Sequence, residues 1–341
     1  MLARLQRAFT LLLVLAALGW VVAWTSAGRL AVAVVGAGLI LFGYAIVLAT
    51  ESVMAARANR SDPAPKASLV QWVRAWWGET RTAPRVFNWR QPFFWDAVPD
   101  SPDGPGRRGI VFVHGFLCNR GFWTPWLERC RAEGIPFVAV SLEPVFGRID
   151  EYVESVEAAV RRLEAGTGLA PVVVAHSMGG LAARAWLQAR QADARVHHVV
   201  TIGSPHGGTL LARHARTPNG RQMRRDSRWL QALAAAEPRE RYRRFTCFYG
   251  HCDNIVFPAS TAALPGAYAV HLAGIAHVAM AFHPGVWDEV RKRLHSPPVA
   301  GPDEGPGRGQ DGAGDQSDGG NSGSPGSTAP AAISGWARTR S

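Results

Sequence analysis

Two long stretches without charge open the chain. No charged residue occurs in 8–28 or in 30–50, and Arg29 alone separates them. Each stretch is close to the roughly 20 apolar residues that a helix needs to cross a bilayer. Trp20 and Trp24 lie near the end of the first stretch, where indole rings favour the membrane interface. We therefore predict a hairpin of two transmembrane helices, at about 8–25 and 30–50.

Residues flanking these stretches bear on cleavage and orientation. Arg4 and Arg7 precede the first stretch and Thr25-Ser-Ala27 could be a cleavage site, so a signal peptide is the alternative; the second stretch would still anchor the chain. Basic residues near span ends favour the cytoplasmic side, and four follow the second stretch: Arg57, Arg60, Lys66 and Arg74. We expect a multi-pass protein of a bacterial cytoplasmic membrane, with the rest of the chain in the cytoplasm.

A polar linker and an amphipathic helix are expected at 57–85, after an anchor at 1–56. Pro63 and Pro65 mark the linker, and Ser68-Leu-Val-Gln71 resembles a capping box that starts a helix. Apolar residues then recur at helical spacing: Leu69, Trp72, Val73, Trp76 and Trp77. Such a helix could lie in the membrane interface or pack on the following domain, and the sequence leaves both open.

From Val86 to Ser296 the pattern changes to short β runs alternating with helices, which indicates an α/β domain. Uniformly apolar runs such as Gly109-Ile-Val-Phe-Val113 are typical of parallel strands buried on both faces. Expected strands are 86–89, 93–98, 109–113, 136–140, 171–175, 196–202, 244–249 and 268–272. Expected helices lie near 124–133, 150–165, 178–191, 226–236 and 284–295. Residues 297–341 are mostly Gly, Ser, Asp and Pro, and we expect a disordered tail.

The charge and the cysteine content of the chain argue against nucleic-acid binding and against a zinc site. The formal charge is +11, carried almost wholly by arginine, with only two lysines, Lys66 and Lys292. No nucleic-acid motif accompanies this charge and the arginines are scattered, so we do not expect nucleic-acid binding. The four cysteines form neither a CxxC pair nor a zinc-like set, and we expect free thiols that are buried or partly buried: Cys118, Cys130, Cys247 and Cys252.

The strongest chemical motif is Ala175-His-Ser-Met-Gly-Gly180, which follows an apolar strand and opens a helix. That is the strand–turn–helix context of a nucleophile elbow, in which a strained turn projects the hydroxyl of Ser177 above the sheet. Residues two before and two after must be small, because the strand and the helix approach closely there. Ala175 stands where glycine is more usual.

Backbone donors for an oxyanion are expected beside this serine. One is the N–H of the residue after the nucleophile, Met178, and the other comes from the loop after an early strand. In that loop Gly115 lets the backbone turn, and Phe116 is the candidate donor. We interpret His114 as a structural hydrogen-bonding residue, and likewise His176 and His206.

A general base and an orienting acid should follow the serine, each after a late strand. Asp253 comes after the apolar run Phe245-Thr-Cys-Phe-Tyr249, and His277 comes after Tyr268-Ala-Val-His-Leu272. Asp226 and Asp288 compete weakly because both look helical. His271 lies inside a strand and His283 starts a helix, so we favour His277.

These motifs together resemble the bacterial lipases of the α/β-hydrolase superfamily, especially the branch related to GPI inositol-deacylases. The resemblance spans 109 to about 290 and rests on Val113-His-Gly-Phe116, the elbow, Thr201-Ile-Gly-Ser-Pro-His-Gly-Gly-Thr209, Gln222–Leu230, Gly250–Pro258 and Gly274–Val278. It implies an α/β-hydrolase fold, a mostly parallel sheet with helices on both faces. It also implies Ser177, Asp253 and His277 as triad, with Phe116 and Met178 as oxyanion hole. Ala175, and Ala276 where a second glycine often stands, depart from the pattern.

The expected function is hydrolysis of carboxylic esters, with lipid esters as the favoured class, through an acyl-enzyme, with no metal or organic cofactor required. The anchor, the tryptophans and an arginine-rich segment at 210–244, which could cap the site, favour a lipid. An acyltransferase or thioesterase could use the same triad. A non-catalytic binding protein on this scaffold is the remaining alternative. The oligomeric state and the acyl and head groups are not readable.

Overall fold

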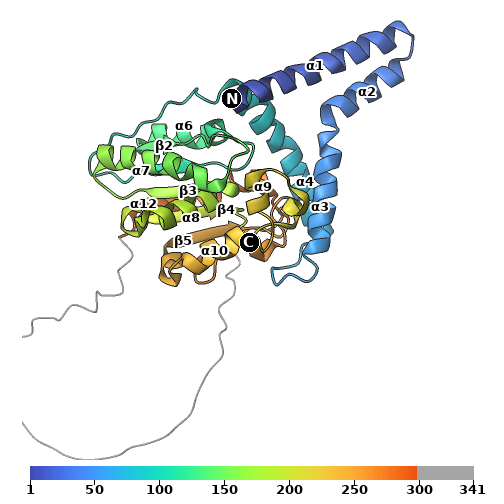
Figure 1. Cartoon of the computed structure of the whole chain (residues 1–341). Helices are drawn as coiled ribbons and strands as arrows, with labels where there is room; N and C mark the ends of the chain where they lie inside the picture. The colour runs from blue at the N-terminus through green and yellow to red at the C-terminus, as the bar shows by residue number, and fades with distance from the viewer. Residues whose placement is uncertain (298–341) are drawn as a thin grey trace, which may run out of the picture. The chain divides into compact units, whose positions relative to one another are not determined.

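The computed structural model describes residues 1–297, so the tail expected at 297–341 lies almost wholly outside the described residues. Within them a six-stranded, fully parallel sheet has the order β2-β1-β3-β4-β5-β6 (Figure 1). Its strands are β1 (Ile110–Val113), β2 (Phe137–Ala139), β3 (Val172–His176), β4 (His198–Ile202), β5 (Phe245–Tyr249) and β6 (Tyr268–His271). The order reverses between β1 and β3, and ligands of such sheets bind beyond the carboxyl ends near that point.

Helices cover both faces of the sheet, as the sequence predicted. Successive side chains of a strand point to opposite faces, so β1 sends Val111 into one core and Phe112 into the other. The first core lies under α7 (Val153–Thr167) and α8 (Met178–Arg190), and the second under α6 (Thr124–Glu133) and α12 (Pro284–His295). Because both faces are covered, the central strands β1, β3, β4 and β5 are buried at every position and are mostly apolar.

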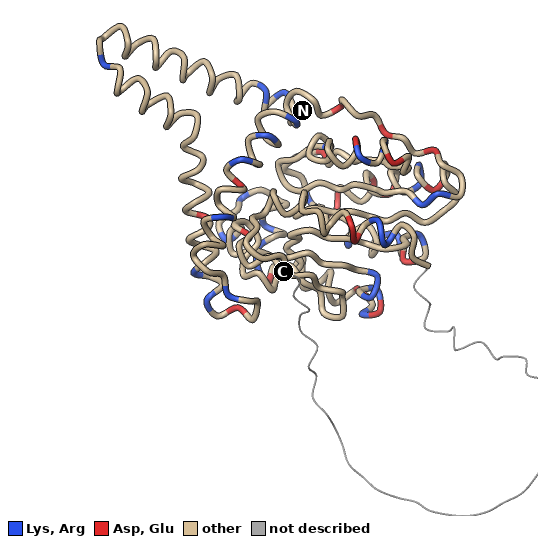
Figure 2. Tube along the Cα trace, turned by 180° about the vertical axis from the view of Figure 1, so that it is seen from behind, with Lys and Arg blue, Asp and Glu red and all other residues tan. Residues whose placement is uncertain are grey.

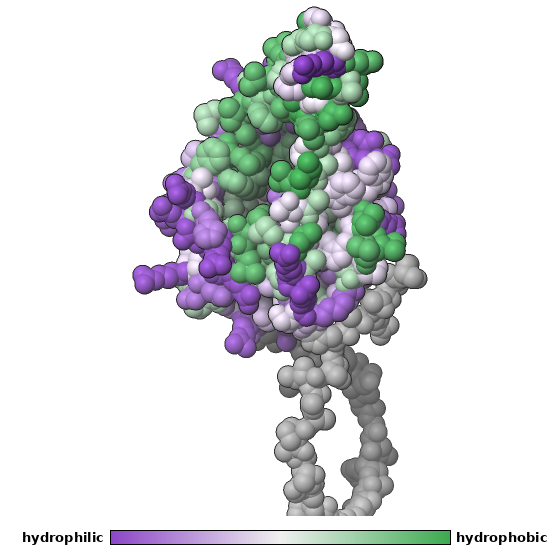
Figure 3. All heavy atoms as spheres, turned by 90° about the vertical axis from the view of Figure 1, so that its right-hand side faces the viewer, coloured by the Kyte–Doolittle hydropathy of each residue, from purple (hydrophilic) through white to green (hydrophobic). Residues whose placement is uncertain are grey.

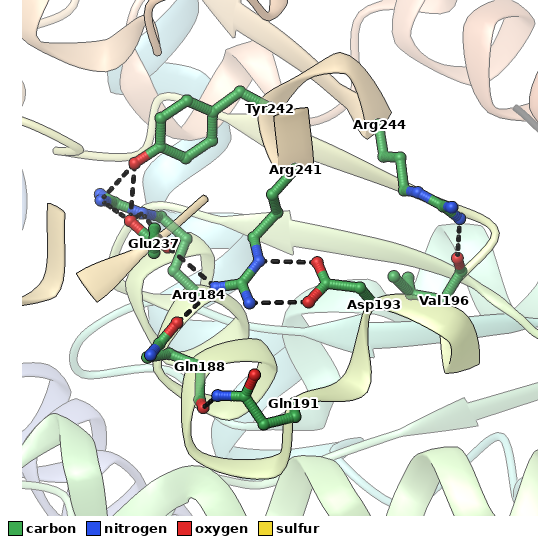
Figure 4. Close-up of polar contacts among 9 residues, drawn as sticks. All are labelled: Arg184, Gln188, Gln191, Asp193, Val196, Glu237, Arg241, Tyr242 and Arg244. Carbon is green, nitrogen blue, oxygen red and sulfur yellow. Dashed lines mark hydrogen bonds and ion pairs between the residues drawn. The ribbon is translucent and has the colours of Figure 1, made fainter. Parts of the chain in front are cut away.

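The segment 210–244 crosses from β4 to β5 as a series of short helices. These are η5 (Leu210–His214), α9 (Pro218–Gln222), α10 (Arg228–Ala236) and η6 (Arg239–Arg244). Its end is fastened to α8 by a buried ion pair between Arg184 and Glu237, to which Tyr242 donates its hydroxyl (Figure 4). Arg241 pairs with Asp193 through two contacts of 2.7 Å. The half of the expected cap nearest β5 is therefore tied to the domain.

The strands expected at 86–89 and 93–98 are wrong. Instead α4 (Leu69–Pro84) continues through a π-helical segment, η1 (Arg85–Arg90), into α5 (Gln91–Phe93). Short apolar runs of this kind do not distinguish strand from helix. The helical path contacts the N-terminal helix α1, while Val86 and Val98 join the core on one face of the sheet. The capping box expected at Ser68 and Gln71 is confirmed.

The N-terminal stretches form helices, but the second is broken. α1 (Leu2–Ser26) is long and apolar enough to cross a membrane. α2 (Leu30–Phe42) and α3 (Tyr44–Ala58) meet at Gly43 with a bend of 52°, so the span expected at 30–50 is not one straight helix. α2 alone rises only about 20 Å, at about 1.5 Å per residue. α1 and α2 lie side by side, and Figure 2 shows no charge on them between Arg7 and Arg29.

The four cysteines are buried free thiols, as expected.

Candidate active site

Ser177 lies between β3 and α8 in a backbone conformation that non-glycine residues rarely adopt, with φ 54° and ψ −128°. Strain of this kind persists only where the surrounding structure enforces it, and it is common at functional sites. Here Ser177 N donates to Ile202 O at 2.9 Å, which ties the turn to the end of β4.

The small residues around Ser177 allow close packing of the turn. A Cβ at Gly179 would lie 2.5 Å from Val113 O, and one at Gly180 would lie 2.2 Å from Ser204 Oγ. Ala175 is fully buried within β3, paired with Val113 and Thr201. The methyl group of Ala175 is therefore accommodated, whereas side chains at 179 and 180 would not be.

Asp253 and His277 lie in direct contact; Asp253 is on the loop after β5, as expected, whereas His277 is the first residue of the short helix α11 (His277–Met280) and not part of a loop. His277 Nδ1 and Asp253 Oδ2 are 2.9 Å apart, and both residues are buried. The other oxygen, Asp253 Oδ1, accepts the backbone N–H groups of Ile255 and Val256 at 2.8 Å. One oxygen of Asp253 thus fixes its own loop and the other faces the imidazole.

Backbone contacts bring Ser177 to the same edge of the sheet as this pair. Its neighbour His176 contacts His277 O through Nε2 at 3.2 Å, and the two rings are 4.6 Å apart. Gly203, directly after the Ile202 that holds Ser177, lies against the pair: a Cβ there would be 3.0 Å from Asp253 Oδ2. All three residues gather at the carboxyl ends of β3, β5 and β6.

The electrostatic setting separates His277 from the other histidines. Burial lowers the pKa of His277, but the carboxylates of Asp253, Glu79 and Glu51 raise it, and the net direction is upward from 6.5. Burial lowers the pKa of His176 and His206 well below that value. His277 is therefore the histidine best placed to accept a proton and hold it.

The loop after β1, where the sequence predicts oxyanion donors, lies against Ser177. A Cβ at Gly115 would lie 2.7 Å from Ser177 Cβ, so the loop can approach the serine only with glycine there. Within residues 1–297 the N–H groups of Phe116 and Met178 have no protein acceptor. His114 Nε2 accepts from Leu142 N at 3.0 Å, and burial lowers the pKa of His114 to about 4. A neutral, structural His114 fits these contacts.

The weaker candidates lie elsewhere. His271 is in β6 with its ring 4.6 Å from that of His251, and His283 caps α12 by accepting from Gly285 N at 3.1 Å. Asp226 and Asp288 are exposed. Among the described residues no group of three His, Cys, Asp or Glu side chains could hold a metal ion.

Sequence reasoning missed a set of polar residues before Val86 that contact the acid and base loops. Glu79 accepts from Val278 N, Glu51 accepts from Asn254, and Asn59 donates to His251 O. The sequence offered one signal for Glu79: it stands four residues after Ala75, so both lie on the same face of α4, and that face is buried. The segment 57–85 is therefore attached to the site and is not a free linker.

Comparisons with known proteins agree with this fold. No curated protein matches the chain. The mature form of lipase BlEst2 from Bacillus licheniformis is 18% identical, with a TM-score of 0.50 over 56% of this chain and 94% of that one. Its propeptide form is 16% identical, with a TM-score of 0.50 over 58% of this chain and 53% of that one. Lipase B from Aspergillus fumigatus is 18% identical, with a TM-score of 0.48 over 57% and 54% of the two chains. The alpha/beta hydrolase family matches residues 110–308, more than half of the chain, and the protein therefore belongs to that family.

Proposed function

We propose that the protein is a membrane-anchored serine hydrolase that cleaves carboxylic esters, with Ser177, Asp253 and His277 as its triad. The observation that carries the proposal is the buried contact of 2.9 Å between Asp253 and His277 beside the strained turn of Ser177. The family and the likeness to solved lipases agree with it.

In the proposed mechanism His277 takes the proton of the Ser177 hydroxyl as that oxygen attacks the ester carbonyl. Asp253 fixes the imidazole and stabilises its protonated form. The N–H groups of Phe116 and Met178 donate to the oxyanion, each contributing about 3–4 kcal/mol to stabilisation of the transition state. His277 then protonates the leaving alcohol, and water releases the acyl group by the same steps.

A lipid ester is the proposed substrate class, because the rim of the site is apolar and adjoins α1. Leu117 follows the proposed oxyanion donor Phe116, and Phe146 packs against Phe116 with ring centroids 5.9 Å apart. Both Leu117 and Phe146 are exposed. Gln6, in the first turns of α1, donates to Leu117 O at 3.2 Å. An acyl chain entering from a bilayer around α1 would meet these side chains first.

The membrane anchor in this proposal is the hairpin of α1 and α2. Its large apolar side chains are mostly exposed, and in Figure 3 the hydrophobic colour covers most of the hairpin at the top of the view. α4 adds exposed Leu69, Val70 and Val73 next to a groove of about 380 Å³ bordered by arginines. An apolar stripe beside basic residues is typical of a helix in the membrane interface.

We further propose that the catalytic domain faces the cytoplasm, because basic residues flank both ends of the hairpin. Fusing alkaline phosphatase and, separately, a fluorescent protein after Ser296 tests the orientation. We expect the phosphatase fusion to be inactive and the fluorescent-protein fusion to be fluorescent. The opposite pair of results would place the domain outside.

Labelling with a fluorophosphonate probe tests the nucleophile. The wild-type protein should be labelled, and Ser177→Ala should abolish labelling. Ser227→Ala is the matched control, since Ser227 also precedes a helix but only caps it. Labelling that survives Ser177→Ala would refute the assignment. A wild-type protein that is never labelled would favour the non-catalytic alternative.

Substrate profiling tests the reaction itself. Activity should appear on p-nitrophenyl esters and on phospholipids, and product analysis with an added alcohol separates hydrolysis from acyl transfer. Transfer to the alcohol in preference to water would replace the hydrolase by the acyltransferase alternative.

A further inference from the structure

The short helix that begins at His277 has its cap supplied by a distant part of the chain. α11 (His277–Met280) follows Ala276, which has no side-chain acceptor for the first N–H groups of the helix. Val278 N donates to Glu79 Oε1 at 2.8 Å and Ala279 N donates to Glu79 Oε2 at 3.0 Å. Both oxygens of Glu79 thus hold the two residues that follow the proposed base.

Glu79 is buried, and within residues 1–297 it forms no ion pair with a lysine or arginine. It is only 2% exposed, and burial raises its pKa to about 7, although its two backbone hydrogen bonds act in the opposite direction. Burying a carboxyl group is unfavourable unless its hydrogen bonds are satisfied. The two N–H groups of α11 meet that requirement, so Glu79 and α11 fix one another.

The helix that carries Glu79 is itself held in place. Trp76 Nε1 donates to Ala45 O at 2.8 Å, and Tyr44 donates its hydroxyl to Thr80 O at 2.7 Å. These bonds join α4 to α3. Glu79 therefore projects from a pair of packed helices and not from a flexible connection.

The same pair of helices reaches the acid loop. Glu51 on α3 accepts from Asn254 Nδ2 at 2.8 Å, and Asn254 Oδ1 accepts the backbone N–H of His277 at 3.3 Å. Asn59, just after α3, donates to His251 O and accepts from Ala259 N, both at 2.9 Å. Both loops of the proposed triad are thus attached to α3 and α4.

We propose, on the basis of the proposed triad, that Glu79 is a positioning residue for His277. It holds the first turn of α11 so that the imidazole faces Asp253 on one side and Ser177 on the other. Glu51 acts on the same loop through Asn254.

This role predicts an electrostatic effect as well as a geometric one. The charged and titratable groups around His277 are Asp253 on the acid loop, Glu79 on α4, Glu51 on α3 and His176 on β3. The negative charge of Glu79 raises the pKa of His277. Glu79→Gln removes that charge, so the acid limb of the kcat/KM profile should move to lower pH. A merely structural role would leave that limb in place.

The test compares variants of the full chain in detergent with a p-nitrophenyl ester. Glu79→Gln should lower kcat by about 10- to 100-fold, because small displacements of a catalytic group have effects of that size. KM should change little, and the acid limb should shift downward. Glu154→Gln is the matched control, since Glu154 lies on an exposed helix surface, and it should leave all three quantities unchanged.

Two further outcomes keep the proposal falsifiable. If Glu79→Gln does not fold, Glu79→Asp carries the test: it keeps the charge but shortens the reach, so kcat should fall without the downward shift. Wild-type kcat in either folded variant would overturn the proposal. If the proposed hydrolase function itself is wrong, the wild-type protein will be neither labelled by the fluorophosphonate nor active. That result differs from an effect of the Glu79 variants alone.

Discussion

His277 can act as a base only while its imidazole is neutral. Burial lowers the pKa of His277, but Asp253, Glu79 and Glu51 together raise it by more, so the pKa lies above the ordinary value of 6.5. The protonated form therefore persists to higher pH than in a free histidine. We predict that kcat/KM falls toward low pH with a midpoint above 6.5, measured by steady-state kinetics across the neutral range.

Asp253→Asn provides the contrast for this profile. The substitution removes a charge that raises the pKa of His277, so the midpoint should move to lower pH. It should also lower kcat by about four orders of magnitude, because an amide no longer fixes the productive tautomer. An unchanged midpoint would contradict the electrostatic account of His277.

Gly203 offers a second test at the residue scale. It has φ +55°, and a Cβ there would lie 3.0 Å from Asp253 Oδ2 and 3.1 Å from His277 Nδ1. Gly168 has a similar φ of +72° but nothing within 4 Å, which makes it the matched control. Both alanine variants should lose about 1–2 kcal/mol of stability, because an L-residue is strained in the left-handed backbone conformation. Only Gly203→Ala should also lower kcat/KM by tenfold or more; equal kinetics in the two variants would refute the crowding argument.

Some residues of the site could be predicted from the sequence and others could not. Ser177, Asp253 and His277 each follow a recognisable strand, and their order along the chain suggested their roles. Glu79 has no motif, because its partners are about 200 positions away, at Val278 and Ala279. Contacts at that separation depend on how α4 packs, which periodicity alone does not specify.

At the scale of elements, the segment before β5 depends on the pair between Arg184 and Glu237, whose side chains are at most 1% exposed. Removing one partner of a buried pair leaves an uncompensated charge. We predict that Glu237→Leu lowers the free energy of unfolding by about 3–5 kcal/mol, measured by chemical denaturation.

The double variant Arg184→Met with Glu237→Leu should recover most of that loss, since both charges of the pair are then removed and the nearby buried Arg241 keeps its pair with Asp193. Glu133→Ala breaks a partly exposed pair with Arg129 and should cost at most about 1 kcal/mol. A double variant as unstable as Glu237→Leu alone would show that the pair is not the cause.

Elements were predicted well where the pattern had one interpretation. The five helices and the six strands after residue 109 that the sequence predicted for the α/β region lie close to observed elements, because buried parallel strands and amphipathic helices have different periods, whereas the short helices α9 and α11 were not predicted. The structure of segment 86–98 was not predicted, since short apolar runs fit a helix as well as a strand. Residues 85–93 are helical and contact α1. The bend at Gly43 was also missed, because hydropathy is uniform across it.

For the whole molecule, α3 and α4 are attached to the site by hydrogen bonds from outside the matched family region. A chain that begins at Val86 would lose Glu51, Asn59 and Glu79 together with their hydrogen bonds to the acid and base loops. We predict that it is inactive or unstable, whereas one that begins at Gly43 keeps ester hydrolysis in detergent. Activity and melting temperature of the two chains check this, and a fully active shorter chain would show that the N-terminal helices only anchor.

The long separation between Glu79 and α11 also has a consequence for biosynthesis. The N-terminal helices leave the ribosome first, and their partners at Val278 and Ala279 follow about 200 residues later. Domains are completed in the order of synthesis, and contacts so distant in sequence form late. In the proposed enzyme, α1 and α2 would therefore reach the membrane before His277 is held in place, and we expect activity only after α11 and α12 have been translated.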